Sequence, residues 1–260
     1  MMLQVAETRV AVVTGGAMGI GAEVSTQLAA SGFTVFVSDI DAHAAERTAN
    51  TLIGDGHSAR ALTMDVGKPE SVAQAFATVT DQHGRCDVLV NCAGIAKFTP
   101  FLELSLDDFS QIMNVNVTGT LLCCQHAARL MVPKGWGRIV NVASVAGIRA
   151  IATGRGAYGV SKAAVISLTQ HIAAELAEHG ITANTVCPGP IDTPLVRKLH
   201  TASYREAYCR AIPMNRYGST REIAAAVMYL VSQDAGYVTG TAIPIDGGFL
   251  ASATLAVEAK

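Results

Sequence analysis

A tyrosine and a lysine, Tyr158 and Lys162, stand four positions apart in a stretch that is otherwise largely apolar and rich in alanine. Residues at positions i and i+4 share one face of a helix, so the Lys162 ammonium can approach the Tyr158 oxygen. A nearby cation favours the ionised form of an acid, and an unperturbed tyrosine with a pKa of about 10 is a poor base at neutral pH. The pair is what a proton-transfer catalyst needs, but Tyr and Lys at this spacing on a helix are more often surface residues without a catalytic role, so the rest of the sequence decides between the two interpretations.

Short β-branched runs alternate with longer helical patterns along the whole chain. Most of the runs are apolar on both faces, which is typical of parallel strands covered by helices on both sides. We therefore predict an α/β fold of the doubly wound, Rossmann type, a three-layer sandwich with a central parallel sheet of about seven strands. The expected strands are Val10–Val13, Thr34–Ser38, Ala59–Thr63, Val88–Asn91, Arg138–Val142, Ile181–Val186 and Ala242–Ile245. The expected helices are Gly19–Ser31, Ala42–Ile53, Pro69–His83, Leu106–Met131, Ala157–Glu178 and Thr220–Ser232.

Residues 1–260 contain no linker rich in proline or serine, no charge run and no repeat, so we expect a single domain. One long polar stretch, at about 193–219, breaks the alternation of strands and helices. A connection of this length in a compact domain is more often a binding element than an idle loop, so we expect a substrate lid there.

Composition excludes several classes of protein. A hydrophobic content of 50% with 15% charged residues indicates a large buried core, and a net charge of -2 does not favour nucleic acid or an anionic membrane as a partner. No segment approaches the run of about 18 apolar residues that spans a membrane. The six cysteines and seven histidines show no metal-ligand spacing, so we expect no metal. Cysteines in apolar runs and an N-terminus without a signal sequence favour a cytoplasmic protein with reduced thiols.

A cluster of glycines follows the first expected strand, in the pattern Thr14-Gly15-x-x-x-Gly19-x-Gly21. Glycine permits a sharp turn and lets a pyrophosphate approach the backbone, while the amides that open the next helix supply hydrogen-bond donors. A tight turn with close helix–strand packing would explain the same glycines. Their place between the first strand and the first helix favours a dinucleotide site.

Asp39 follows the second expected strand, about twenty residues after the glycines. A carboxylate there accepts hydrogen bonds from both ribose hydroxyls and repels a 2′-phosphate, and no Arg or Lys follows it before Arg47. The alternative for Asp39 is a helix cap, a role that Asp41 fits better. We therefore expect NAD rather than NADP as the cofactor.

With these motifs in order, the chain resembles the short-chain dehydrogenase/reductase family in its compact single-domain form, from about Val10 to Phe249. The glycine loop, Tyr158 and Lys162 match the family pattern. The other matching segments are Asp65-Val66, Asn91-Cys-Ala-Gly94, Asn116 in Asn-Val-Thr-Gly, Ser144, Pro188-Gly189 with Thr193, and Asp246-Gly-Gly248.

The resemblance implies a catalytic set. Tyr158 would be the general base in alcohol oxidation and the general acid in ketone reduction, and Lys162 would lower its pKa and hold the nicotinamide ribose. Ser144 would donate a hydrogen bond to the substrate oxygen. Asn116 would hold a water that links Lys162 to solvent, and Asn114, two positions away on the helix, would face elsewhere.

The resemblance also implies cofactor contacts along the chain. Asn91 would stabilise the sheet and border the adenosine rather than act chemically, and Thr193 would bind the carboxamide unless it serves only as a helix cap. The implied cofactor residues are Gly15, Met18, Gly19, Ile20, Asp39, Asp65, Val66, Asn91, Ala93, Gly94, Tyr158, Lys162, Pro188, Gly189, Ile191 and Thr193.

The sequence is least informative about the substrate. The family usually separates its serine and tyrosine by about thirteen residues, whereas Ser144 and Tyr158 are one position further apart, so the loop between them is longer. Arg149 and Arg155 lie in this loop and, with Ser144 and Tyr158, are candidate substrate residues. They favour a small polar molecule such as a polyol, a sugar or a hydroxy acid, although both arginines could simply be solvated.

Three functional hypotheses follow. The first is an NAD-dependent oxidoreductase that interconverts a secondary alcohol and a ketone. The second is a ketoreductase of the 3-oxoacyl-(acyl-carrier-protein) reductase type, which normally employs NADP. The third is an NAD-binding sensor without turnover, which we would expect to lack part of the Ser144, Tyr158, Lys162 and Asn116 set. The resemblance further implies a homotetramer.

Overall fold

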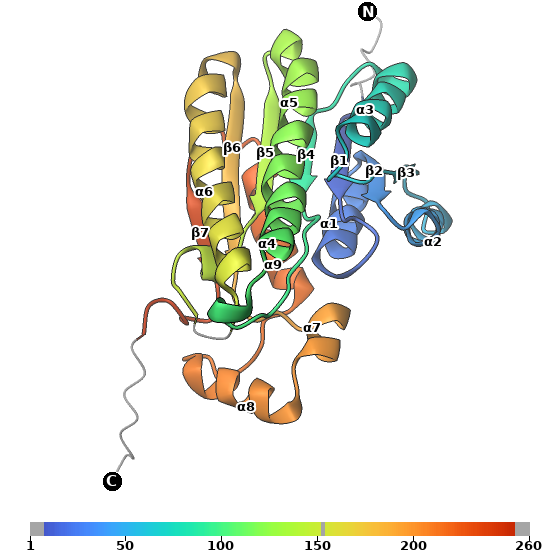
Figure 1. Ribbon diagram of the computed structural model, residues 1–260. Helices are drawn as coiled ribbons and strands as arrows, with labels where there is room; N and C mark the ends of the chain where they lie inside the picture. The colour runs from blue at the N-terminus through green and yellow to red at the C-terminus, as the bar shows by residue number, and fades with distance from the viewer. Residues whose placement is uncertain (1–7, 152–153, 253–260) are drawn as a thin grey trace, which may run out of the picture.

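A parallel sheet lies at the centre of the computed structural model, which describes residues 8–151 and 154–252 (Figure 1). Within these ranges the strands are β1 (Val10–Thr14), β2 (Thr34–Asp39), β3 (Ala59–Thr63), β4 (Val88–Asn91), β5 (Gly137–Val142), β6 (Ile181–Pro188) and β7 (Ala242–Ile245). Their order across the sheet is β3-β2-β1-β4-β5-β6-β7, and each neighbouring pair is parallel. The doubly wound fold expected from the sequence is confirmed.

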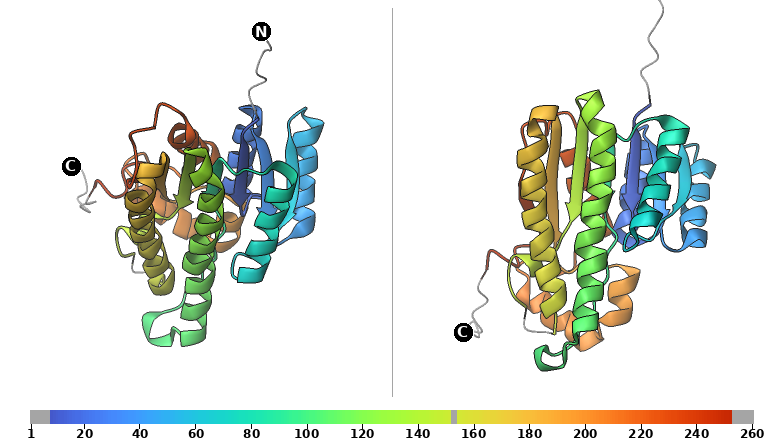
Figure 2. Two further views of the ribbon diagram at one scale, coloured as in Figure 1. Left: turned by 90° about the horizontal axis from the view of Figure 1, so that it is seen from above. Right: turned by 45° about the horizontal axis from the view of Figure 1, so that its top comes forward.

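Helices cover both faces of this sheet. They are α1 (Gly19–Ala30), α2 (Ala42–Gly54), α3 (Pro69–His83), α4 (Leu106–Met113), α5 (Gly119–Met131), α6 (Gly156–Leu176), α7 (Pro194–Leu199), α8 (Ala202–Ala211) and α9 (Thr220–Val231). Side chains of α1, α2 and α9 share one core with the sheet, and those of α3, α5 and α6 share the other. The view from above shows these two layers on either side of the strands (Figure 2).

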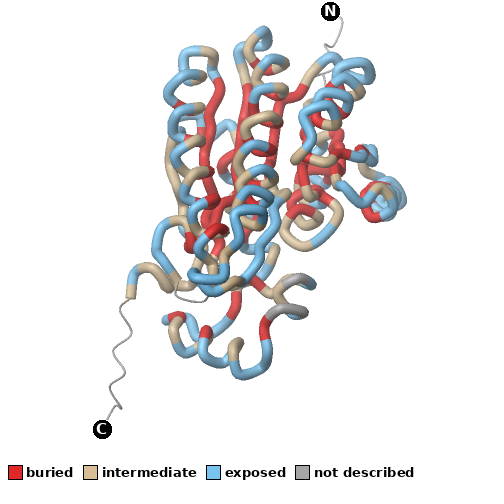
Figure 3. The backbone as a smooth tube through the Cα atoms, viewed as in Figure 1, coloured by how far each residue is buried: buried red, intermediate tan, exposed pale blue. Residues whose placement is uncertain are grey.

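The strands are buried on both faces because both faces carry apolar side chains. Every residue of β1, β4, β5 and β6 is buried, and the buried backbone runs through the middle of the molecule (Figure 3). A strand covered by helices on both sides has no solvent face that requires polar residues. This explains why the strands read as continuous apolar runs rather than as alternating ones.

The chain reverses its direction of winding between β1 and β4, which are neighbours in the sheet. In open α/β sheets, ligands bind outside the carboxyl ends of the strands at such a point. A site is therefore expected at the carboxyl ends of β1, β2 and β4 to β6. This is the end of the sheet at which α7 and α8 lie (Figure 1).

Two segments differ from the elements expected from the sequence. The helix expected at Leu106–Met131 is interrupted by a π-helical turn at Asn114–Thr118, between α4 and α5. Such turns widen a helix locally and are frequent at functional sites. The stretch expected as a lid, at about 193–219, contains the two short helices α7 and α8 rather than only irregular chain.

Within the described residues, no helix is both long and apolar enough to cross a membrane.

Candidate active site

A cleft of about 600 Å³ opens at the carboxyl ends of the strands. All the cofactor residues implied by the sequence line it except Asn91, and three of the four candidate substrate residues, Ser144, Arg155 and Tyr158, line it as well. The structure does not bring Asn116 or Arg149 to its wall. Other residues that line the cleft include Phe98, Gln111, Ile151, Val196, His200 and Tyr208.

The glycine loop lies between β1 and α1 because only glycine fits there. Gly15 has a φ of +60°, and a Cβ on it would lie 2.8 Å from the Ala93 main-chain nitrogen. A Cβ on Gly21 would collide with the carbonyl oxygen of Gly15. The loop is therefore folded tightly against the end of β4, and the first turn of α1 is left open toward the cleft. This cradle fits a pyrophosphate.

The end of the cleft beside β2 and β3 is acidic. Asp39 accepts hydrogen bonds from the main-chain nitrogens of Ala17, at 3.4 Å, and Asp41, at 3.2 Å. Asp41 itself caps α2 through Ala44, which confirms the expectation that Asp41 rather than Asp39 is the cap. Asp65 lies at the same end of the cleft, after β3. The residues that line this end include two carboxylates and no basic side chain. Such a lining favours the binding of ribose hydroxyls over that of a phosphate.

Asn91 does not reach the cleft because its side chain is occupied within the sheet. Its Nδ2 donates to Asn141 Oδ1 at 2.8 Å, and its Oδ1 accepts from Thr14 Oγ1 at 3.4 Å. Asn141 in turn donates to Thr169 Oγ1 of α6 at 2.8 Å. This buried polar network, Thr14, Asn91, Asn141 and Thr169, joins β1, β4 and β5 to the helix that carries Tyr158 and Lys162.

Tyr158 and Ser144 meet at the end of the cleft beside β5 and β6. Ser144 follows β5, is 8% exposed, and accepts a hydrogen bond from the Ala146 main-chain nitrogen at 3.1 Å. Burial raises the pKa of Tyr158, while the hydrogen bond between its side chain and Ser144 and the positive charge of Arg155 lower that pKa. Burial is the largest of these effects, so the phenol is held in its protonated form at neutral pH.

Lys162 is directed mainly at the backbone rather than at the phenol. It is 5% exposed, its Nζ donates to the main-chain oxygen of Val142 at 2.9 Å, and it lies 5.7 Å from the centre of the Tyr158 ring. Burial lowers the pKa of Lys162 to about 8. The lowering of the Tyr158 pKa that the sequence led us to expect from Lys162 is therefore not produced by this arrangement.

Asn116 lies in the π-helical turn and is fully buried. Its Oδ1 accepts from the Ile95 nitrogen at 2.8 Å, and its Nδ2 donates to the Ile95 oxygen at 3.0 Å and to Ser161 Oγ at 2.9 Å. Asn114 is exposed and binds the Gly67 oxygen. The side chain of Asn116 thus fixes the loop after β4 next to Lys162, since a Cβ on Gly94 would lie 3.2 Å from Asn116 Oδ1 and 3.4 Å from Lys162 Nζ.

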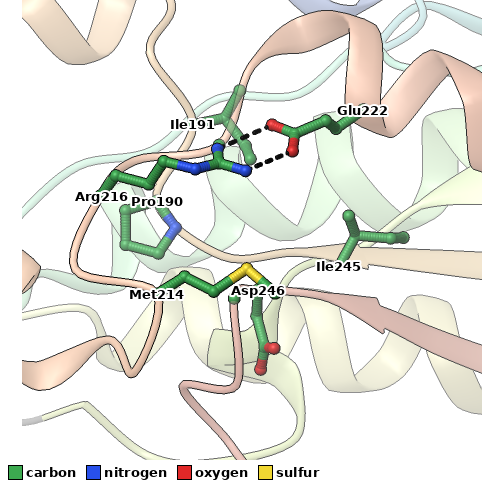
Figure 4. A pocket seen from close by; sticks show the side chains of 9 residues that line it. Pro190, Ile191, Met214, Arg216, Glu222, Ile245 and Asp246 are labelled. Atoms are coloured by element: carbon green, nitrogen blue, oxygen red, sulfur yellow. Dashed lines mark hydrogen bonds and ion pairs between the residues drawn. The ribbon is translucent and has the colours of Figure 1, made fainter.

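The segment at about 193–219, which the sequence analysis expects to be a lid, is tied together at its base. The main chain pairs Ile191, just after β6, with Gly218, just before α9, through hydrogen bonds of 2.9 and 3.0 Å. Figure 4 shows the guanidinium of Arg216 facing the carboxylate of Glu222, which it binds at 2.7 and 3.0 Å. At the cleft side, Thr193 Oγ1 caps α7 by accepting from Val196. The segment between these points lies as a closed loop beside the cleft.

Arg155 contacts the segment at about 193–219. Its Nη2 lies 3.3 Å from His200 Nε2 and 3.4 Å from Tyr204 Oη, and its guanidinium lies 4.5 Å from the centre of the Phe98 ring. Arg149, in contrast, is exposed, and its guanidinium lies 5.9 Å from the ring of Phe249, away from the cleft. The longer loop between Ser144 and Tyr158 therefore places one of its two arginines in the site, while residues 152 and 153 lie outside the described part of the chain.

The residues of the site fit a nicotinamide dinucleotide. The glycine cradle, the acidic end and the cluster of Ser144, Tyr158 and Lys162 follow one another along one cleft. No group of three or more His, Cys, Asp or Glu side chains within the described ranges is arranged to hold a metal ion.

Comparisons with known proteins agree with this geometry. A family model described as enoyl-(acyl carrier protein) reductase matches residues 15–250. The D-threitol dehydrogenase of Mycolicibacterium smegmatis is 37% identical over 93% of this chain and 92% of its own length. The 3-oxoacyl-(acyl-carrier-protein) reductase FabG of Aquifex aeolicus is 36% identical over 92% and 96% of the two chains. A gluconate 5-dehydrogenase from Burkholderia cenocepacia, solved with NADP and tartrate, superimposes with a TM-score of 0.90 at 31% identity, covering 94% and 96% of the two chains.

The chain belongs to the short-chain dehydrogenase/reductase family. It is an oxidoreductase of the class that binds a nicotinamide cofactor and acts on CH–OH or keto groups.

Proposed function

We propose that this protein is an NAD-dependent oxidoreductase that interconverts a secondary alcohol and a ketone of a small polar molecule, a polyol, a sugar or a hydroxy acid. The proposal rests on the arrangement of the residues that line a single cleft. Ser144, Tyr158 and Lys162 gather at one end, and Asp39 and Asp65 lie at the other, with the glycine loop between them.

Each residue of the set has a distinct role in this proposal. When bound, NAD accepts the hydride from the carbinol carbon or returns it to the ketone. Tyr158 accepts the hydroxyl proton in oxidation and donates it in reduction. Ser144 holds the substrate oxygen against the phenol and stabilises the charge that develops on it. Lys162 binds the nicotinamide ribose hydroxyls. Asn116, which fixes the loop at Ile95, holds a water that links Lys162 to solvent.

The charges along the cleft support NAD over NADP. The basic residues that line the cleft are Lys162, Arg155 and His200, and all belong to the end at Tyr158. The opposite end carries Asp39 and Asp65. A 2′-phosphate beside Asp39 would add a negative charge next to a carboxylate with no cation from the cleft wall to compensate it.

Two relatives support a small polar substrate, because one is a D-threitol dehydrogenase and another is a gluconate 5-dehydrogenase bound to tartrate. We propose the segment at about 193–219 as the lid over this substrate, within a single domain of residues 1–260. Thr193 would bind the carboxamide from the start of the lid. Half-buried apolar side chains on α5 and α6, such as Leu121 and Leu168, are available for self-association into a homotetramer.

The second candidate is a ketoreductase that acts on acyl-carrier-protein substrates, which the Aquifex aeolicus relative favours. The two candidates differ in cofactor and in substrate.

We would measure the formation and consumption of NADH and, in parallel, of NADPH. The substrates would be alditols, aldonates and their keto forms, and an acetoacetyl thioester. Oxidation of a polyol or hydroxy acid with NAD supports the first candidate. Reduction of the thioester with NADPH alone would replace it with the second.

A further inference from the structure

We propose that the cleft binds the carboxylate of an anionic substrate at Arg155, and that His200 positions this guanidinium. The inference rests on the proposed function, because it places the reacting alcohol of the same molecule at Tyr158. It narrows the substrate from small polar molecules in general to hydroxy acids.

The charge of Arg155 is not balanced by a carboxylate. Among the described residues it forms no ion pair, and its polar contacts, His200 and Tyr204, are neutral acceptors. The arginines of the neighbouring lid are paired: Arg197 and Arg205 with Asp192, Arg210 with Glu206, and Arg216 with Glu222. A cation that lines a partly enclosed cleft without a counter-charge attracts an anion more strongly than one in open solvent.

Only some of the N–H groups of the Arg155 guanidinium donate hydrogen bonds. Its contacts with the lid involve Nη2, whereas Nε is buried and has no hydrogen-bond partner among the residues that the structure describes. A guanidinium binds a carboxylate through two parallel N–H groups, and a buried N–H without a partner is costly. A substrate carboxylate would supply the missing acceptor. Phe98 lies against the face of the guanidinium and holds the plane of the fork.

His200 can act on Arg155 only as an acceptor. Arginine has no acceptor atom, so the contact between its Nη2 and His200 Nε2 requires that Nε2 carries no proton. The proton then resides on Nδ1, which donates to Tyr217 Oη at 2.9 Å. Burial and the charges of Arg155 and Arg205 lower the pKa of His200, which favours this neutral form. His200 is 8% exposed and Tyr217 is also buried, so these two residues form a buried support that sets the direction of the half-buried Arg155 guanidinium.

Arg155 is close enough to the reacting end of the cleft for one small molecule to contact both. It immediately precedes α6, which carries Tyr158 in its first turn, and its charge lowers the pKa of that tyrosine. Both side chains line the same cleft. Arg149, from the same loop, does not line it and cannot take this role. The specificity for an acid is thus assigned to Arg155 alone.

The test compares hydroxy acids with neutral polyols of the same carbon skeleton: lactate with propane-1,2-diol, glycerate with glycerol, threonate with threitol, and gluconate with sorbitol. The kcat/KM for NAD reduction and, separately, the affinity of each compound for the NADH-saturated protein by calorimetry are measured at fixed ionic strength. We expect the acid of at least one pair to exceed its polyol by about 10- to 100-fold, as for hydrogen bonds to a charged group. Arg155→Gln should remove this preference.

Two further variants separate positioning from structure. His200→Phe removes the acceptor and should raise KM for the acid with kcat within about twofold, whereas His200→Gln supplies an amide oxygen and should restore part of the affinity. Arg210→Gln changes an exposed, ion-paired lid arginine and should leave the acid preference intact. NADH affinity of each variant checks that the cleft has folded.

The outcomes also distinguish the inference from the proposed function. If alcohols are oxidised but acids gain nothing over polyols, or Arg155→Gln affects both alike, the carboxylate site is wrong and the function stands. If acid binding depends on Arg155 but no alcohol is oxidised, the site stands and the proposed function is wrong. If the protein neither oxidises an alcohol nor binds an acid through Arg155, both are overturned.

Discussion

The ammonium of Lys162 donates a hydrogen bond of 2.9 Å to the main-chain oxygen of Val142, the last residue of β5. This contact ties α6 to the end of β5, two residues before Ser144. The ammonium is nevertheless buried, and one carbonyl replaces only part of its lost hydration. Lys162 therefore serves the site at a cost to the stability of the fold.

The first prediction concerns this cost. The pKa of Lys162 is lowered to about 8, whereas the lysine of an unfolded chain titrates near 10.4, so the unfolded state binds more protons between these values. Stability contributed by this group therefore rises as the pH increases from about 8 to about 10.4. Lys162→Met removes a buried charge and should stabilise the protein below pH 8 by up to the order of 3 kcal/mol, with the gain shrinking as the pH rises.

Urea unfolding of Lys162→Met and the parent protein at several pH values between about 7 and 10 measures this difference. Burial raises the pKa of Tyr158 and of the buried cysteines, so in the folded protein these groups stay protonated over this range. Their titration in the unfolded chain is common to both proteins and cancels in the comparison. Lys134→Met, at an exposed lysine, is the control and should show a difference that does not change with pH. A gain for Lys162→Met that grows with pH would contradict the burial argument.

The second prediction concerns Tyr158. Because burial raises its pKa, ketone reduction, which needs the protonated phenol, should stay constant from about pH 7 to 9. Alcohol oxidation, which needs the phenolate, should rise over the same range. Tyr158→Phe should lower both rates by about 10²- to 10⁴-fold and leave NADH affinity, followed by its fluorescence, nearly unchanged. Full activity of this variant would exclude Tyr158 as the acid–base group, and NADH binding without turnover in the parent protein would favour a sensor.

The sheet and its helices could be predicted because each rests on local signals, whereas most of the cleft residues are implied by the resemblance to the family. Apolar runs give the strands, and the glycine loop, Asp39 and Tyr158 are identified by residue type at fixed spacing. The direction of Lys162 could not be predicted, since it depends on a carbonyl of β5 twenty positions earlier in the chain. Helical spacing places Lys162 beside Tyr158, but the position of β5 determines whether the ammonium donates to the Val142 carbonyl or lies at the Tyr158 oxygen.

The two arginines of the long loop between Ser144 and Tyr158 are a second case in which the sequence could not predict where a side chain lies. Arg149 and Arg155 are equivalent in sequence, and only the path of the loop separates an exposed side chain from one that lines the cleft. His200 carried no signal, because a single histidine in a polar stretch has no spacing to mark it. Its role depends on Arg155 and Tyr217, which lie 45 and 17 positions away. Contacts between distant segments are set by packing, which residue spacing does not encode.

The third prediction concerns the cofactor. Asp39→Ser removes the carboxylate that would bind the ribose hydroxyls and repel a 2′-phosphate. We expect the ratio of kcat/KM for NAD to that for NADP to fall by about 10- to 100-fold, as for the loss of hydrogen bonds to a charged group. Asp41→Ser is the matched control, because Asp41 caps α2 and a serine can still cap it, so the ratio should not move. A parent protein that prefers NADP would show that Asp39 does not select the cofactor.

The fourth prediction concerns the buried polar network between the sheet and α6. Asn141→Ala removes the acceptor of Asn91 and the donor to Thr169, and leaves two buried polar side chains without these partners. Each unsatisfied buried group costs about 1 to 3 kcal/mol, so the free energy of unfolding should fall by about 2 to 5 kcal/mol. Asn114→Ala, which removes an exposed asparagine bound only to the Gly67 oxygen, should cost less than about 1 kcal/mol.

Kinetics of the same variants show whether the network also positions the catalytic helix. Asn141 lies within the sheet and does not line the cleft, so its loss reaches the site indirectly, through Thr169 and α6 on one side and through Asn91 and Thr14 on the other. If the network holds α6 in register with β5, Asn141→Ala should lower kcat by severalfold at a temperature where it remains folded, with little change in KM for NAD, since the glycine loop and Asp39 lie on other elements. A folded variant with unchanged kcat would limit the network to stability.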